Sequence, residues 1–443
     1  MDLSTPQASV QKLQAALHAK AKESPTFRFY ALYDKVYRAD VLSVALTRCQ
    51  ANKGAPGVDG QTFADIEAYG RDQWLAELAQ ELKARTYKPN AVKRVWIPKA
   101  DGKQRPLGIP TIRDRVVQMA AVLVLEPIFE ADLQPEQFAY RAERSASDAV
   151  RLVQSYLDQG YTEVVDADLS GYFDSIPHAE LMKSVARRIS DRHVLHLVKM
   201  WLEAAVEETD EQGRTQRTTV NKDSHRGTPQ GGVASPLLAN LYMRRFLLGW
   251  KQAGHEQRLQ SRIVNYADDF VILTRGHAEQ AMATMRVMMA KLKLTVNEKK
   301  TRTCSLPEEE FTFLGFTFGK QYSWKTGRPY IGPAPATKKV QAICQKISEA
   351  TCRRTVRRAT ARQVEQLNAM LLGWANYFRL GYVTAAWRAV QQHACQRLRW
   401  WLQRKHGNKG RKGSTYPPWV LHQKLGLVEL ARRVRRSPLW AKA

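Results

Sequence analysis

Two short acidic motifs place carboxylates beside apolar runs. In VVDADLSGYFDSI, strand alternation puts Val164, Asp166 and Asp168 on one face. In RIVNYADDFVIL, Asp268 and Asp269 form a turn between two apolar runs. An acidic turn alone is usually a solvated turn, because Asp tolerates turn backbone angles. Carboxylates that meet at strand ends repel one another unless cations neutralise them, and two Mg²⁺ ions about 3.5–4 Å apart, which clamp the oxygens of a phosphoryl displacement, are the usual solution.

The elements that must position these carboxylates are predicted to form an α/β layer. Alternation and turn signals predict a strand over 162–169, a hairpin over 262–273, a following helix that reaches residue 292, and strands near 294 and over 311–318. Before this layer, the patterns predict helices over 8–22, 27–50 and 66–86, then a hairpin that starts at 92–98 and has a basic tip. The Gly/Pro loop over 226–236 leads into a helix, for which Ser235 is the expected N-cap and Pro236 the first residue.

Charge is distributed unevenly along the 443 residues. The formal net charge is +27, and residues 321–443 contain 25 Lys and Arg against only three Asp and Glu. Seven of the eleven tryptophans also lie in this segment. A nearly neutral body with a basic, aromatic-rich tail favours a polyanion-binding module, and stacking on unpaired bases is typical of single-stranded RNA recognition. The alternative is a solvated cationic surface.

Composition excludes several classes of protein. With 44% hydrophobic and 25% charged residues the chain is globular, and its apolar runs are far shorter than the ~20 residues that span a bilayer. The N-terminus lacks a secretory pattern. The scattered cysteines form no CxxC pair, which predicts neither disulfides nor a structural zinc site. We therefore expect a protein of a reducing cytoplasm without a membrane partner. The cysteines are Cys49, Cys304, Cys344, Cys352 and Cys395.

The C-terminal third is predicted to be a separate helical unit. Residues 319–337 are rich in Gly and Pro, and three apolar patterns with helical spacing follow, which start near Val340, Val364 and Trp387. The predicted boundaries divide the chain into an N-terminal extension (1–90), a central region (91–320), a linker (321–337) and a basic helical domain (338–443).

At this point the chain resembles a known family. RPLGIPTIRDRVVQ, DLSGYFDSI, GTPQGGVASPLLANLYM, YADD, LTVNEKKT and FLGF occur in the order of the reverse transcriptase blocks of bacterial group II introns. DKVYRADVL with NKGAPGVDG is similar to the extension that precedes those blocks, and GWANYFR is similar to the maturase, or thumb, region. The resemblance implies an α/β (α+β) right-hand polymerase, in which an antiparallel palm sheet carries the YADD hairpin and an α-helical thumb/maturase domain follows.

The resemblance also implies a reaction and its residues. Asp168, Asp268 and Asp269 would hold two Mg²⁺ ions, for which Mn²⁺ is a possible substitute, with the carbonyl of Leu169 as a further ligand. A primer 3′-hydroxyl would attack the α-phosphate of a deoxynucleotide paired to an RNA template, and Phe173 would be the steric gate against a 2′-hydroxyl; core packing is the other reading of Phe173. The implied nucleotide-binding residues are Lys99 and Arg105 (with Lys103 an alternative to either), Gln230, Gly231 and Lys300. The basic residues expected to contact RNA are Arg353, Arg354, Arg357, Arg358, Lys409, Arg411 and Lys412. The resemblance implies a group II intron RNA as a partner, and hence a bacterial protein in a ribonucleoprotein or associated with the nucleoid.

One stretch departs from the family pattern. Where relatives often have Phe-Arg-Pro-Gly-Arg-Ser, this chain has YRAERS over residues 140–145, so the path of that loop and its template contacts are not transferred. The chain also has no paired Cys and His ligands of an endonuclease. Two other functions stay open: a host-adopted reverse transcriptase in phage defence, CRISPR spacer acquisition or DNA repair, and a non-catalytic RNA-binding splicing cofactor.

Overall fold

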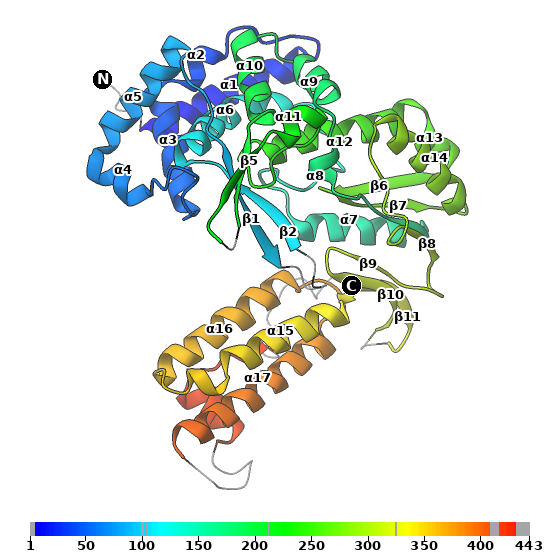
Figure 1. The fold of residues 1–443 in the computed structure, drawn as a ribbon. Helices are drawn as coiled ribbons and strands as arrows, with labels where there is room; N and C mark the ends of the chain where they lie inside the picture. The colour runs from blue at the N-terminus through cyan, green and yellow to red at the C-terminus, as the bar shows by residue number, and fades with distance from the viewer. Residues whose placement is uncertain are drawn as a thin grey trace.

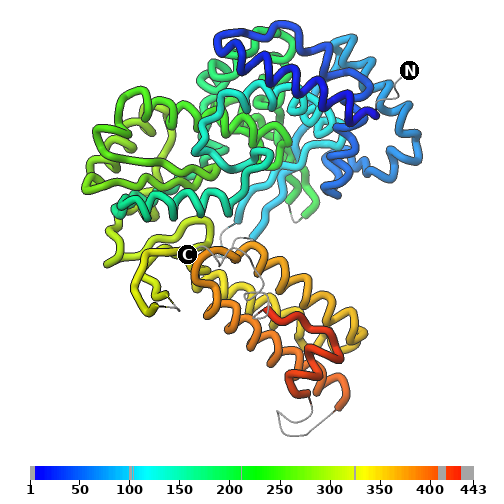
Figure 2. Tube along the Cα trace, turned by 180° about the vertical axis from the view of Figure 1, so that it is seen from behind, coloured from blue at the N-terminus to red at the C-terminus, as the bar shows by residue number. Residues whose placement is uncertain are grey.

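The chain folds into a helical lobe, a region of sheets and a separate helical bundle, seen from two sides in Figures 1 and 2. The computed structural model describes residues 5–98, 102, 104–210, 212–323, 326–407 and 416–430. Lys99, Lys103, Lys409, Arg411 and Lys412, which the sequence singled out, lie outside these residues.

The N-terminal lobe consists of helices that pack around the long buried helix α6. Its members are α1 (Pro6–Glu23), α2 (Tyr33–Val36), α3 (Ala39–Ala51), α4 (Phe63–Tyr69), α5 (Arg71–Ala84) and α6 (Ile112–Glu130). A four-stranded sheet follows in the order β2-β1-β4-β5, and its β1–β2 hairpin extends toward the helical bundle (Figure 1). Its strands are β1 (Val92–Pro98), β2 (Gln104–Ile109), β4 (Val206–Thr209) and β5 (Thr215–Thr218).

The second sheet has the antiparallel order β6-β7-β3-β8. Its strands are β3 (Glu163–Asp168), β6 (Ser261–Tyr266), β7 (Asp269–Thr274) and β8 (Arg302–Ser305). Helices α7 (Ala146–Asp158) and α14 (Ala278–Lys291) pack against this sheet. The other helices of this part of the chain are α8 (Tyr172–Ser175), α9 (His178–Ala186), α10 (Arg192–Leu202), α11 (Val220–Ser224), α12 (Ser235–Gln252) and α13 (His255–Arg258).

Both faces of this sheet are buried. Val165 and Ala167 belong to the main core with the helices of the N-terminal lobe, whereas Val164 belongs to a second core. In that second core the rings of Phe311 and Phe318 stack at 4.9 Å between centroids. Each fully buried side chain of this size stabilises the fold by about 1.5–3 kcal/mol, so the position of the strand is well determined.

A third sheet and the helical bundle complete the chain. The sheet has the order β11-β10-β9, with β9 (Phe311–Phe313), β10 (Phe316–Tyr322) and β11 (Pro329–Pro335). The bundle comprises α15 (Thr337–Ala350), the 3₁₀ turn η1 (Arg353–Thr355), α16 (Thr360–Tyr377), α17 (Thr384–Lys405) and the π-helical turn η2 (Val420–Lys424). The expected linker over 321–337 is therefore wrong in part, because much of it pairs as a β-hairpin. Proline is tolerated in β11 because β11 is an edge strand, where one side needs no ladder hydrogen bonds.

Three other local predictions are also corrected. The helix expected over 27–50 is interrupted, because the Asp191 carboxylate accepts the backbone N–H groups of Leu32 and Tyr33, both at 2.8 Å, and so ends the preceding segment in an extended path. The helix expected over 66–86 is divided at Gly70, whose φ of +108° is not helical. In place of a strand near 294, Val296 makes a single bridge to Leu169.

The N-cap of α12 also differs from the prediction. Ala234 occupies the cap position, and Ser235 is the first helical residue. The hydroxyl of Ser235 donates to the carbonyl of Pro229 at 2.9 Å, so it closes the preceding loop instead of capping the helix. In the part of the chain that the structure describes, no helix has the length and apolar character needed to cross a bilayer.

Candidate functional site

The acidic residues from the two motifs meet at one end of the second sheet. Asp168, the last residue of β3, is the cross-strand partner of Asp269, the first residue of β7. Asp268 lies in the two-residue turn between β6 and β7, next to Ala267 with its φ of +58°. The amide of the buried Asn265 donates to the Ala267 carbonyl at 2.8 Å and fixes this turn. Asp168 and Asp269, 101 positions apart in the sequence, are thus neighbours.

The carboxylates influence one another electrostatically. Burial and, after it, the neighbouring charges of Asp268 and Asp168 together raise the pKa of Asp269 to about 6, while Lys300 and Lys339 act in the opposite direction. Burial likewise raises the pKa of Asp166, also to about 6. A cluster whose members disfavour one another's ionisation is stabilised by added positive charge.

Asp168 is fixed by three residues of the segment that follows α14. The Lys300 ammonium lies 3.1 Å from one Asp168 oxygen, and the Asn297 amide donates to that oxygen at 2.8 Å. The Thr301 hydroxyl accepts the Asp168 backbone N–H at 3.3 Å. Lys300, one of the expected nucleotide-binding residues, therefore lies beside this carboxylate. Sequence reasoning missed Asn297, although it lies in the LTVNEKKT block.

The donor chemistry of this site fits a hard divalent cation. Carboxylate oxygens are the preferred ligands of Mg²⁺. The charges of Asp268 and Asp168 add to burial in raising the pKa of Asp269, so a cation at this site would be stabilised. Within the described ranges, no three His, Cys, Asp or Glu side chains already converge as a formed metal site, and Lys300 lies beside Asp168. Near Leu169, the Asp168 carbonyl accepts the Asn297 N–H and the Ser170 N–H donates to the Thr295 carbonyl. Neither hydrogen bond uses the Leu169 carbonyl, the expected further metal ligand.

Gln230, in the loop before α12, joins strand β2 to helix α8. Its side-chain oxygen accepts from Arg105 Nε at 3.0 Å, and its amide donates to Asp174 at 2.8 Å. Its backbone carbonyl accepts the Gly108 N–H at 2.5 Å. Gly231, with a φ of +108°, lies so close to β2 that a Cβ there would overlap the Gly108 carbonyl. The structure thus brings together Arg105, Gln230 and Gly231, three of the expected nucleotide-binding residues.

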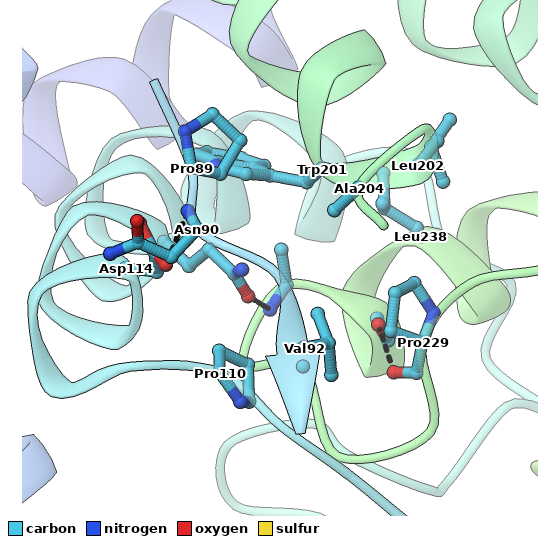
Figure 3. Close-up of a pocket in the computed structure, with 14 residues that line it drawn as sticks. Pro89, Asn90, Val92, Pro110, Asp114, Trp201, Leu202, Ala204, Pro229 and Leu238 are labelled. Atoms are coloured by element: carbon cyan, nitrogen blue, oxygen red, sulfur yellow. Dashed lines mark hydrogen bonds between the residues drawn. The ribbon is translucent and has the colours of Figure 1, made fainter. Parts of the chain in front are cut away.

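Buried residues of α6 and of the segment before β1, here called the buried seam, pack against this loop. Figure 3 shows Asn90 and Asp114 on one side of a small cavity and Pro229 on the other. The Asp114 carboxylate accepts from the Tyr87 hydroxyl at 2.7 Å and the Asn90 N–H at 3.0 Å, and burial raises its pKa. Gln118 accepts the Ala234 N–H at 3.3 Å. The cavity of about 10 Å³ has room for roughly one water, so this seam positions the loop and does not bind a substrate.

Phe173 lies behind the carboxylates, on the short helix α8. Its side chain is buried, and its carbonyl accepts the Thr228 N–H at 2.8 Å, which ties α8 to the loop that contains Gln230. Its ring meets the edge of Tyr140, with 6.4 Å between centroids. This position is compatible with core packing and with a steric gate against a 2′-hydroxyl, because a ring packed on one face can still limit the space at its other face.

A cleft of about 510 Å³ opens next to the carboxylates. Its lining comes from the second sheet, the β9–β10 hairpin, α15 and the end of α16. The lining residues include Asp166, Asp269, Leu314, Lys339 and Tyr377. The Tyr377 hydroxyl donates to the Leu314 carbonyl at 3.0 Å and joins the bundle to the hairpin. The helical bundle therefore closes one side of the cleft.

The four expected RNA-contacting residues that the structure describes lie in one exposed turn of the bundle. Arg353, Arg354, Arg357 and Arg358 are all exposed and lie between α15 and α16, at the end of the bundle away from Tyr377. Lys405 near the end of α17 donates to the Arg358 carbonyl at 2.8 Å, so the end of α17 adds to the same surface. The structure thus separates this basic surface from the carboxylates.

Comparison with known proteins gives the class of this fold and site. Residues 97–318 match the reverse transcriptase (RNA-dependent DNA polymerase) family, and the chain belongs to that family. Residues 340–419 match the maturase-specific domain of group II introns, so the two regions occur in the order found in group II intron-encoded reverse transcriptase/maturases.

Individual relatives agree with this assignment. The chain is 34% identical to Protein YkfC of Escherichia coli strain K12 over 343 residues, which cover 69% of this chain and 87% of YkfC. It is 33% identical to the group II intron-encoded protein LtrA of Lactococcus lactis over 217 residues, 48% of this chain and 34% of LtrA. Among solved structures, a chain of a partial Cas6-RT-Cas1–Cas2 complex aligns with a TM-score of 0.34 at 21% identity, covering 58% of this chain and 42% of that one.

Proposed function

We propose that this protein is an RNA-directed DNA polymerase that adds deoxynucleotides to a primer 3′-hydroxyl and binds a group II intron RNA. The observation that supports this most is the cross-strand pair of Asp168 and Asp269, with Asp268 beside it; Asp269 also lines a cleft of about 510 Å³. In this proposal residues 1–90 are the extension and start of the fingers, 91–320 the fingers and palm, and 338–443 the thumb.

The three aspartates would hold two Mg²⁺ ions, which would neutralise charge on the attacking and leaving oxygens. The primer oxygen forms a bond to the α-phosphorus, the bond to pyrophosphate breaks, and the hydroxyl proton leaves with solvent. Arg105 offers a guanidinium for phosphate oxygens, and Gln230 holds that guanidinium in place. Phe173 limits the space beneath the sugar, so a 2′-hydroxyl is disfavoured.

The intron RNA would bind along the bundle. A maturase-specific domain occupies residues 340–419, and the exposed Arg353, Arg354, Arg357 and Arg358 supply phosphate contacts at its end. This assignment gives the basic segment a partner that its charge requires. A splicing or mobility role for the same RNA follows from this proposal.

Primer extension on an RNA template tests the polymerase assignment. We expect the wild-type chain to extend a DNA primer with deoxynucleotides and Mg²⁺, and Asp268→Ala to reduce the rate by at least about 10³-fold, the order of loss seen when a principal electrostatic group of a site is removed. Asp72→Ala on α5, an exposed acid remote from the sheet, is the matched control. Equal extension by wild type and Asp268→Ala would exclude this site.

A further inference from the structure

Tyr140 lies beside the candidate site in the YRAERS stretch that departs from the family pattern. Its ring is 53% exposed, and its edge-to-face partner is Phe173, at 6.4 Å between centroids with planes at 81°. Its φ is +56°, in the left-handed region that bulky residues rarely adopt. Such conformations persist where the surrounding structure imposes them, and they concentrate at functional sites.

The chain on both sides of Tyr140 is fixed by buried polar contacts. The Asn240 amide donates to the Ala139 carbonyl at 2.7 Å. On the other side, the Arg141 guanidinium donates to the Gln137 carbonyl at 2.7 Å and pairs with Glu130. These contacts hold the backbone on both sides of Tyr140 in place, and the Tyr140 ring packs against Phe173. The strain at Tyr140 therefore serves the placement of one half-exposed aromatic side chain.

The groups around the Tyr140 hydroxyl belong to both halves of the candidate site. Burial raises the pKa of Tyr140, the Asp268 carboxylate raises it further, and Arg105 lowers it. The Tyr140 phenol is therefore near both the acidic turn and Arg105. A nucleotide with its triphosphate at Arg105 and its sugar over Phe173 would meet the Tyr140 ring at the side of the sugar.

We propose that Tyr140 is a specificity-determining residue whose ring forms a second wall of the sugar pocket and keeps the Phe173 ring from moving aside for a 2′-hydroxyl. This inference rests on the proposed polymerase function. The wall is a matter of ring volume, because the T-shaped contact uses the ring and not the hydroxyl.

Primer extension on an RNA template with dGTP or GTP as the single nucleotide measures this role. We expect Tyr140→Ala to lower the ratio of kcat/KM for dGTP to that for GTP by at least about tenfold, within the range that small changes of pocket shape produce. Tyr140→Phe keeps the ring and should stay within about twofold of wild type. Tyr140→Leu, which keeps apolar bulk but not a planar ring, should fall in the same direction as alanine and gives a second reading if the alanine variant does not fold.

Tyr30→Ala is the matched control, because Tyr30 is also exposed and its ring also meets a phenylalanine, Phe27, at 6.4 Å, in the N-terminal lobe. An unchanged dGTP to GTP ratio in folded Tyr140→Ala or Tyr140→Leu would overturn the inference. A loss as large in Tyr140→Phe would assign the effect to the hydroxyl and also overturn it. Failure of the wild-type chain to extend any primer would instead refute the proposed function, and the two failures are thus distinguishable.

Discussion

Replacement of Gly231 by alanine should displace the fingers hairpin from the loop before α12. A Cβ on Gly231 would overlap the Gly108 carbonyl oxygen, with the carbonyl carbon at 3.2 Å and Leu107 Cδ1 at 3.0 Å. The obstacle is backbone of β2, which cannot rotate away as a side chain end can. A φ of +108° adds strain of about 1–3 kcal/mol for any residue with a side chain.

The magnitude follows from the distance that β2 must move. Relief of the overlap requires a shift of roughly 1 Å, a displacement that can cost about 10²-fold in rate at a reacting centre. The shift also lengthens the hydrogen bond from the Gly108 N–H to the Gln230 carbonyl. It therefore also displaces Arg105 from the Gln230 side-chain oxygen that holds it. We expect Gly231→Ala to lower kcat/KM for a deoxynucleotide by about 10²-fold in primer extension.

Gly70→Ala separates the overlap from the backbone strain. Gly70 has the same φ of +108°, and a Cβ there would meet only Gln73, at an ordinary 3.9 Å. Both variants should lower the denaturant midpoint, but Gly70→Ala should keep kcat/KM within about twofold of wild type. Wild-type kcat/KM in Gly231→Ala would refute the argument that close approach of β2 positions the nucleotide residues.

Three further predictions concern the carboxylates and the bundle. Lys300→Met removes the cation paired with Asp168, so we expect a lower kcat and a lower half-saturating Mg²⁺ concentration, measured by Mg²⁺ titration of primer extension, whereas Lys299→Met on the same exposed turn should change neither. Trp401→Ala should destabilise the bundle by about 3–5 kcal/mol, seen as an earlier thermal transition, because Trp401 is fully buried; Trp419→Ala, with a half-exposed ring, should not. If the basic bundle neutralises about eight phosphates of a duplex RNA, log K should fall against log salt with a slope of roughly −7, and a flat response would contradict phosphate contact.

Several parts of the fold were predictable from local sequence. The alternation around Val164 and Asp168 predicted a strand, and the structure confirms β3 there, with a separate core on each of its sides. The apolar spacing near Val340, Val364 and Trp387 predicted the bundle helices, because one buried stripe of a helix repeats every three to four residues. Such patterns depend only on neighbouring residues, so a single sequence contains them.

Other parts depended on contacts between distant segments. The N–H groups of Leu32 and Tyr33 bond to Asp191, 158 or more positions away, so no local pattern reveals that the helix predicted there is interrupted. The placement of Lys300 and Asn297 on Asp168, and of Tyr140 against Phe173, has the same origin. The residue types of the candidate site were thus determined by the sequence alone. Their pairing was decided by the tertiary structure, because a hydrogen bond or ring contact depends on distance in space and not on separation along the chain.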